Sequence, residues 1–225
     1  RLFTQGMITR DGAKMSKSRG NVISPQSYID RYGADTARAY ILFIGPPDQD
    51  ADWSDTGVEG VHRFLSRLWR MSAETADETP DHPVPDELSE SDLELLRKAH
   101  WAIEKVTNDI AGRFAFNTAI AAVMELTNTI SKQREEGDPS PGALRFALAT
   151  AASLLFPFAP HTAADAHERL TGRKIEGADR RAQRGERIHR PYRGVTAEGE
   201  CGEADSDERR AGLGERGSDA AQPDC

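Results

Sequence analysis

Residues 92–133 read DLELLRKAHWAIEKVTNDIAGRFAFNTAIAAVMELTNTISKQ, and this stretch decides the fold. Apolar residues recur in it at helical spacing, in two successive segments. We expect a first helix from about Asp92 to Ala111, with these side chains pointing inward: Leu93, Leu96, Ile103, Val106 and Ile110. A second helix should run from about Asn117 to Gln133, with an inward face of Ile120, Val123, Met124 and Thr127.

Helix signals continue on the C-terminal side of this stretch. Ser140-Pro141 is a typical helix start, with a hydroxyl at the N-cap and proline at the first helical position, and this helix should end before Pro157. A shorter helix is expected from about His161 to Leu170, ending at Gly172. Amphipathic helices joined by short Gly/Pro connections predict an antiparallel α-helical bundle.

A further helix is expected before the stretch. Helical spacing predicts a buried stripe on a helix of about four turns, formed by Val58, Val61, Phe64, Leu65 and Leu68. Residues 79–87 contain three prolines and many acids, which predicts an exposed linker. Ser89 and Asp92 then offer a capping box for the next helix.

Residues 1–45 have another pattern, that of a short α/β connector. Residues 2–4 and 7–9 are β-prone, Asp11-Gly12 is a turn signal, and a loop should extend through Asn21. The protein is therefore expected to be mainly α, with this connector ahead of the bundle.

Two short helices should complete the connector. Ser24-Pro25 predicts a helix start and Gly33 predicts its end. Residues 34–44 predict a second helix, which Gly45-Pro46-Pro47 breaks. A polar loop should follow to Thr56.

We expect three parts, at residues 1–45, 46–172 and 173–225. The last part has 53 residues, of which 23 are charged and few are large and apolar, so it should be disordered. Arginine outnumbers lysine ten to one there. Two hypotheses stay open: translation of a GC-rich reading frame other than the native one, or a natural disordered tail.

The composition indicates an ordinary polar protein, with 37% hydrophobic and 29% charged residues. No apolar run approaches the roughly 18–20 residues that span a bilayer, so no membrane contact is expected. The cysteines, Cys201 and Cys225, both lie in the tail, and neither a disulfide framework nor a zinc site is predicted. Without an initiator Met or a signal-peptide layout, the chain reads as the interior of a longer, cytoplasmic protein.

Charge is distributed unevenly along the chain. The formal net charge is −8, but residues 1–40 carry seven basic and three acidic side chains. Residues 41–172 carry 11 basic and 22 acidic side chains. A phosphate-handling site therefore fits the N-terminal segment best, and the remainder is expected to be a solvated acidic surface.

The chemistry is concentrated in residues 14–21, KMSKSRGN. Lys14 and Lys17 place two ammonium groups three residues apart, among hydroxyls and between Gly12 and Gly20. This pattern is typical of a mobile loop that binds phosphates. Such a cation can stabilise the charge that builds on pyrophosphate when a carboxylate attacks the α-phosphorus of ATP. A basic, serine-rich loop that is simply solvated is the plainer alternative.

The complete pentad KMSKS at residues 14–18 resembles the second signature of class I aminoacyl-tRNA synthetases. Residues 20–25 and 32–38 resemble the corresponding segments of the leucyl, isoleucyl, valyl and methionyl enzymes. Other segments are similar to the leucyl family in particular: residues 5–7, 46–47, 52–55, 57–60, 63–65, 69 and 113–120. The resemblance covers about residues 1–172.

By this resemblance, Lys17 contacts ATP and stabilises the adenylation transition state, and Lys14 assists it. Met15, Ser16 and Ser18 shape the ATP-binding loop. In the leucyl family, leucine and ATP give leucyl-adenylate, and the leucyl group then passes to tRNA(Leu). Mg²⁺ accompanies the ATP, bound mainly through its phosphates, and no metal site built by the protein is expected. The resemblance also implies a monomer.

Arg63, Arg67 and Arg70 recur along one helix and are candidates for contacts with the tRNA backbone; a solvent-facing stripe is the alternative. Trp53 and Trp69 are expected to be packing residues. His161 should cap or pack at its helix start.

The chain departs from the family pattern in what it lacks. The nucleotide-binding fold with its His-x-Gly-His loop, and the editing domain, would have to lie outside it, so this chain alone is expected not to aminoacylate tRNA. Two rival hypotheses stay open. One is a stand-alone helical tRNA-binding module that uses no ATP; the other is a related class I enzyme, such as an isoleucyl, valyl or methionyl synthetase or a cysteine ligase.

Overall fold

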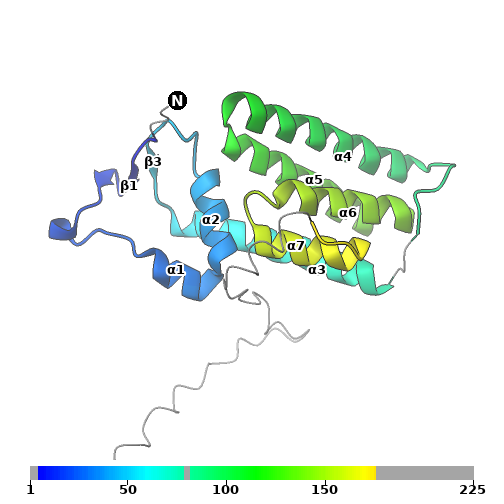
Figure 1. The fold of residues 1–225 in the computed structure, drawn as a ribbon, viewed down its shortest axis with the longest axis horizontal. Helices are drawn as coiled ribbons and strands as arrows, with labels where there is room; N and C mark the ends of the chain where they lie inside the picture. Colours follow the sequence, from blue (N-terminus) through cyan, green and yellow to red (C-terminus); the bar gives the residue numbers. More distant parts are fainter. Residues whose placement is uncertain (1–4, 79–81, 176–225) are drawn as a thin grey trace, which may run out of the picture. The chain divides into compact units, whose positions relative to one another are not determined.

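The computed structural model describes residues 5–78 and 82–175, which belong to one compact unit. Seven α-helices and a small three-stranded sheet make up this described part (Figure 1). The predicted mainly α fold is confirmed. The strand expected at residues 2–4, and the disorder expected for all but the first three residues of the tail, lie outside the described residues.

The sheet has the order β2-β1-β3 and consists of very short strands. Strand β1 (Ile8–Arg10) pairs antiparallel with β2 (Ala13–Lys14) and parallel with β3 (Ala51–Asp52). Asp11 and Gly12 link β1 to β2 with φ angles of 53° and 69°, as a two-residue hairpin turn with two positive φ values requires. The predicted turn is confirmed, but β3 lies in the segment expected to be loop, because two residues leave no periodic signal.

The connector helices begin and end close to the predicted residues. A 3-10 turn, η1 (Lys17–Arg19), follows β2, and it falls within the expected loop. Helix α1 (Pro25–Tyr32) begins after Ser24, and α2 (Ala34–Phe43) follows Gly33 directly. Gly33 has φ 85° and ψ 157°, a backbone conformation that only glycine adopts readily.

Five longer helices form the bundle (Figure 1). They are α3 (Asp55–Glu78), α4 (Glu90–Asn108), α5 (Phe116–Glu136), α6 (Pro141–Leu155) and α7 (Pro160–Thr171). Helix α4 packs against α5 and α6, and α3 packs against α6 and α7. Helix α2 contacts α3, α5 and α7, so the connector is packed onto the bundle.

The predicted helix starts at Ser89 and Ser140 are confirmed. Ser89 and Asp92 form a reciprocal capping box, and Ser140 Oγ accepts from the backbone N–H of Ala143. Asp92 is buried and also accepts from the backbone N–H of Ser140 at 2.7 Å. Burial raises the pKa of Asp92, but the hydrogen bonds from Ser140 and Ser89 outweigh it and hold that pKa below its usual value. One carboxylate therefore ties the start of α4 to the start of α6.

Three expectations about these helices were wrong. Helix α3 has 24 residues rather than about four turns, because its buried stripe continues through Met71 and Thr75. In α4 the buried apolar face is Leu95, Ala99, Ala102 and Val106, whereas Ile103 is 37% exposed and Leu93 and Leu96 are only partly buried. The α-helix also ends at Asn108 and continues as a π-helical turn, η2 (Asp109–Arg113).

The corrected face of α4 predicts unequal costs for two truncations. Leu95→Ala should lower the free energy of unfolding by about 2–5 kcal/mol, because it empties a fully buried site. Ile103→Ala should cost about 1 kcal/mol or less, because that side chain already faces solvent. Urea unfolding followed by circular dichroism measures both values. A larger loss for Ile103→Ala than for Leu95→Ala would contradict this face.

Candidate active-site loop and tRNA interface

The lysine loop, residues 14–21, is closed by the side chain of Asn21. The backbone N–H of Ser16 donates to Asn21 Oδ1 at 2.9 Å, and Asn21 Nδ2 donates to the Lys14 carbonyl oxygen at 3.3 Å. Within the loop, the Gly20 N–H donates to the Lys17 carbonyl oxygen at 3.2 Å, with Gly20 at φ 68°. One asparagine therefore fixes both ends of a compact turn.

The loop presents its cations to solvent. Lys14 and Lys17 are exposed, Lys14 at the end of β2 and Lys17 at the start of η1. Within the described residues, neither ammonium group forms an ion pair. Met15 and Ser16 are partly buried, and the hydroxyls of Ser16 and Ser18 lie 3.1 Å apart. A phosphate can therefore meet both lysines without breaking an internal ion pair.

Two carboxylates from the β3 segment fix the hairpin that leads into the loop. Asp52 Oδ1 accepts from Thr9 Oγ1 at 2.7 Å and from the Gly12 N–H at 3.1 Å. The hydrogen bond from Thr9, followed by that from Gly12, lowers the pKa of Asp52 below its usual value. Asp50 Oδ1 accepts from the Met7 N–H at 2.7 Å. Sequence reasoning missed these residues; their only signal is the alternation of two acids in a polar loop.

Aromatic packing fixes the same region from the other side. The ring of Trp53 stands edge-on to the rings of Tyr28 and Tyr40, with centroids 4.9 Å away in each case. Trp53 Nε1 donates to Asp55 Oδ1 at 2.9 Å, and the Tyr28 hydroxyl donates to the same oxygen. Trp53 therefore packs as expected, and it joins α1 and α2 to the start of α3.

The three arginines of α3 differ in their surroundings. Arg67 is partly buried and donates to Asn128 of α5. Arg70 lies 3.8 Å from Glu74. Arg63 is exposed and forms no ion pair with any residue that the structure describes. Of the three tRNA-contact candidates, Arg63 has the guanidinium most available to an external phosphate.

The other two residues considered from sequence take part in packing. Trp69 Nε1 donates to Asp165 on α7 at 2.5 Å, and the guanidinium of Arg169 lies 5.2 Å from the centre of the Trp69 ring. His161 lies at the start of α7, with Nδ1 2.9 Å from Asp35 Oδ1. Both residues therefore connect α7 to another helix.

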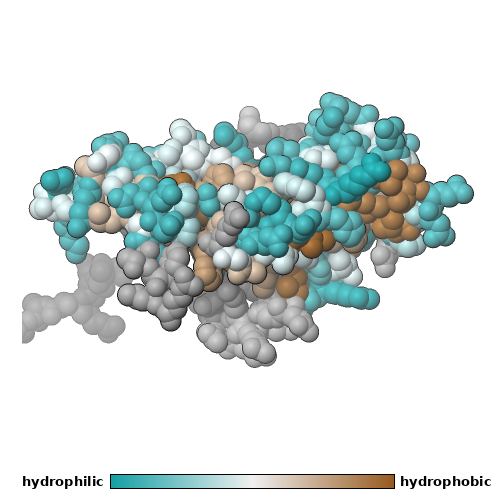
Figure 2. Space-filling view, turned by 90° about the horizontal axis from the view of Figure 1, so that it is seen from above, coloured by the Kyte–Doolittle hydropathy of each residue, from teal (hydrophilic) through white to brown (hydrophobic). Residues whose placement is uncertain are grey.

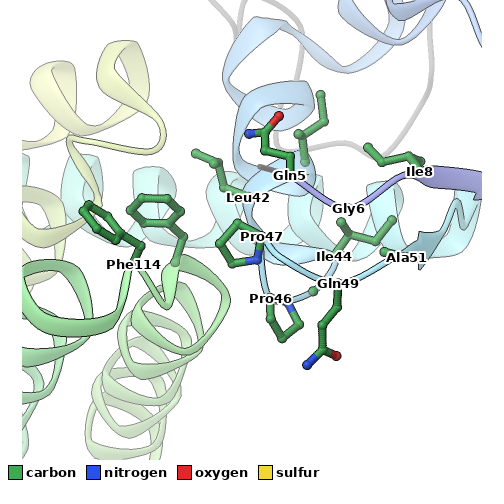
Figure 3. A pocket seen from close by; sticks show the side chains of 13 residues that line it. Gln5, Gly6, Ile8, Leu42, Ile44, Pro46, Pro47, Gln49, Ala51 and Phe114 are labelled. Carbon is green, nitrogen blue, oxygen red and sulfur yellow. The ribbon is translucent and has the colours of Figure 1, made fainter. Parts of the chain in front are cut away.

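An apolar cavity of about 310 Å³ (Figure 3) has no lysine among the residues that line it. Phe114 lines it from the segment before α5, and Pro47 lines it from the loop after α2. The N–H of Gly6 donates to the Pro47 carbonyl oxygen at 3.0 Å, and a Cβ at position 6 would lie 2.0 Å from the Gln49 carbonyl oxygen. Only glycine fits there, so the strand and the loop meet backbone to backbone.

The face seen in Figure 2 is largely hydrophilic, with hydrophobic residues in separate areas. Across residues 5–78 and 82–175, no cluster of three or more His, Cys, Asp or Glu side chains could hold a metal ion. Within those same ranges, no helix is long and apolar enough to cross a membrane.

Comparisons with known proteins match two segments of the chain. Residues 1–62 match the family model "tRNA synthetases class I (M)", and residues 92–192 match "Anticodon-binding domain of tRNA ligase". The second match extends past residue 172, where we expected the resemblance to end.

Individual relatives point the same way. The leucine–tRNA ligase of Thermosipho melanesiensis is 50% identical over 165 residues, which make up 72% of this chain and 20% of that protein. The LeuRS of Agrobacterium radiobacter K84, solved as a ternary complex with tRNA and LeuAMS, has a TM-score of 0.66 and 34% identity over 76% of this chain and 22% of that one. A Mycobacterium tuberculosis methionyl-tRNA synthetase bound by methionyl-adenylate has a TM-score of 0.59 and 21% identity, over 76% of this chain and 39% of that one, and shows the fold alone.

The helical bundle and both family matches are those of class I aminoacyl-tRNA synthetases. Within that class, the chain belongs to the leucine–tRNA ligase family. It spans about a fifth of the length of the two leucine–tRNA ligases that it matches.

The anchoring of the hairpin predicts a selective effect of two substitutions. In Asp52→Ala the Gly12 amide should exchange its hydrogen roughly fivefold faster, because it loses a charged acceptor. Asp50→Ala is the matched control: exchange should rise at Met7 and stay unchanged at Gly12. Hydrogen exchange resolved by residue measures both. Equal effects of the two substitutions on Gly12 would show that Asp52 has no particular part in fixing the turn.

Proposed function

We propose that this chain acts as part of a leucine–tRNA ligase. It would contribute its lysine loop to the formation of leucyl-adenylate from leucine and ATP, and its helices to the binding of tRNA(Leu). The observation that carries the proposal is the pair of exposed ammonium groups, Lys14 and Lys17, on a loop anchored at both ends. Residues 1–45 would be the edge of the catalytic domain, and residues 46–172 the tRNA-binding helical domain.

The chemistry assigns each lysine a role. A carboxylate oxygen of leucine attacks the α-phosphorus of ATP, the bond from that phosphorus to the bridging oxygen breaks, and pyrophosphate leaves with the negative charge. The ammonium group of Lys17 would neutralise that charge as it develops, and Lys14 would hold the neighbouring phosphate oxygens. Contacts of this kind lower a barrier by about 3–4 kcal/mol each. Mg²⁺ would be bound mainly by the phosphates of ATP.

The remaining residues of the loop would shape it. Met15 and Ser16 are the partly buried members of the pentad, so they would seat the loop on the connector. The hydroxyl of Ser18 lies 3.1 Å from that of Ser16, and a hydrogen bond between them would stabilise the turn that carries Lys17.

For tRNA, the support is the likeness to a LeuRS solved with tRNA, together with the exposed guanidinium of Arg63. Arg67 and Arg70 would then act mainly by holding α3 and its neighbours, because both already have partners within the protein. We place the ligase in the cytoplasm, acting as a monomer. The chain spans about a fifth of the Thermosipho melanesiensis ligase, so we assign the activity to the complete ligase and expect none from residues 1–225 alone.

The proposal predicts a loss of adenylate formation in Lys17→Ala. In the complete ligase, leucine-dependent ATP–pyrophosphate exchange should fall by about 100-fold or more, because the departing pyrophosphate loses its counter-charge. Lys132→Ala, which removes an exposed lysine on α5 remote in sequence from the loop, is the control and should leave exchange unchanged.

The same assay separates the rivals. Normal exchange in Lys17→Ala would overturn the role given to this lysine. Exchange that responds to isoleucine, valine, methionine or cysteine instead of leucine would replace the leucine assignment. Binding of tRNA with no exchange for any amino acid would favour a binding module without ATP chemistry.

A further inference from the structure

A buried carboxylate joins the connector to the last helix of the bundle. Asp35 lies in the first turn of α2 and is only 5% exposed. Its Oδ2 accepts from the backbone N–H of Thr162 at 2.6 Å, and its Oδ1 lies 2.9 Å from His161 Nδ1. Both partners lie at the start of α7, so the Asp35 side chain links α2 to a helix that is far away in the sequence.

Helix α7 has no cap of its own. Its N-cap residue is Ala159, which offers no side-chain hydrogen bond, and Pro160 has no N–H to satisfy. The Thr162 N–H lies in the first turn of α7, where backbone N–H groups normally donate a hydrogen bond to the side chain of the N-cap residue. Asp35 takes the place of this missing cap, from 127 residues away in the sequence.

The position of the carboxylate is favourable for a second reason. It lies in the first turn of its own helix as well as at the start of α7, so two helix N-termini direct their partial positive charge toward it. A buried carboxyl group that accepts from the Thr162 N–H and lies beside the His161 ring nitrogen therefore links α2 to the start of α7.

The bond also crosses between the two family matches. Asp35 belongs to the segment that matches class I tRNA synthetases, and Thr162 belongs to the segment that matches the anticodon-binding domain. Gly33 connects α2 directly to α1, and α1 follows the lysine loop. Two short helices therefore connect the Asp35–Thr162 contact to the segment that carries Lys17.

We propose that Asp35 is a positioning residue that caps α7 and so sets the angle between the helical bundle and the lysine-loop segment. In this role, which rests on the proposed function, it aligns tRNA bound on the helices with the adenylate. The lysine loop has its own anchors in Asn21 and Asp52, so loss of the cap affects the tRNA step and spares adenylate formation.

The test measures both steps in the complete ligase. In Asp35→Ala, kcat/KM for tRNA in leucylation should fall about tenfold, while leucine-dependent ATP–pyrophosphate exchange stays within about twofold of wild type. Asp35→Asn keeps an acceptor for the Thr162 N–H and should recover most of the leucylation. Asp30→Ala removes an exposed carboxylate on α1 whose one side-chain hydrogen bond among the described residues comes from Gln26 of the same helix, and it should change neither activity.

The outcomes separate this inference from the proposed function. Equal loss of exchange and leucylation in Asp35→Ala, or no loss of either, overturns the positioning role. If Asp35→Ala does not fold, His161→Ala is the fallback, because it removes the second contact that positions the Asp35 carboxylate against the Thr162 N–H; leucylation must then fall while exchange is kept, or the inference fails. Absence of leucine-dependent exchange in the wild-type ligase would instead overturn the proposed function.

Discussion

Close approach of helices through alanine is the constraint on which the bundle depends. Alanines lie at the contacts of four helices with 0–1% of their surface exposed, among them Ala99, Ala102, Ala119, Ala122 and Ala147. A methyl side chain lets two backbones approach closely, so larger side chains such as Leu95 and Leu126 fill the space between these contacts. The orientation of each helix is thereby fixed, and the connector packs onto a rigid surface.

The same constraint explains where sequence reasoning succeeded and failed. Helix starts at Ser89 and Ser140 were predictable, because capping depends on neighbours in the sequence. The start after Ser24 was predictable from Pro25 at the first helical position, although the Ser24 side chain forms no cap hydrogen bond. The buried face of α4 was not predictable in this way. The spacing of large apolar residues favoured a face with Leu93 and Ile103, whereas in the folded chain the buried face contains alanines. Strand β3 was missed for a related reason: it exists only through its pairing with β1.

In the candidate site, too, local features were predictable from the sequence and long-range contacts were not. The lysines were recognisable because the pentad is a local motif, with Lys14 and Lys17 at fixed spacing. Asn21, which closes the loop, is part of the same local segment, but the carboxylates that hold the surrounding elements come from elsewhere: Asp52 lies 40 residues from Gly12 in the hairpin, and Asp35 lies 127 residues from Thr162 in α7. The sequence places these carboxylates in a polar loop and a helix, and only the folded chain shows which backbone N–H groups they accept from.

The backbone contact at Gly6 has a consequence for how this region can vary. Surface loops usually accept insertions at little cost, because closing a slightly longer loop costs little entropy. The loop after α2 is different, since its carbonyl oxygens at Pro47 and Gln49 lie directly against the chain that enters β1. An extra residue there would displace the strand and, with it, the hairpin that carries the lysines. Homologous ligases are therefore expected to keep the length of this loop while its exposed side chains diverge.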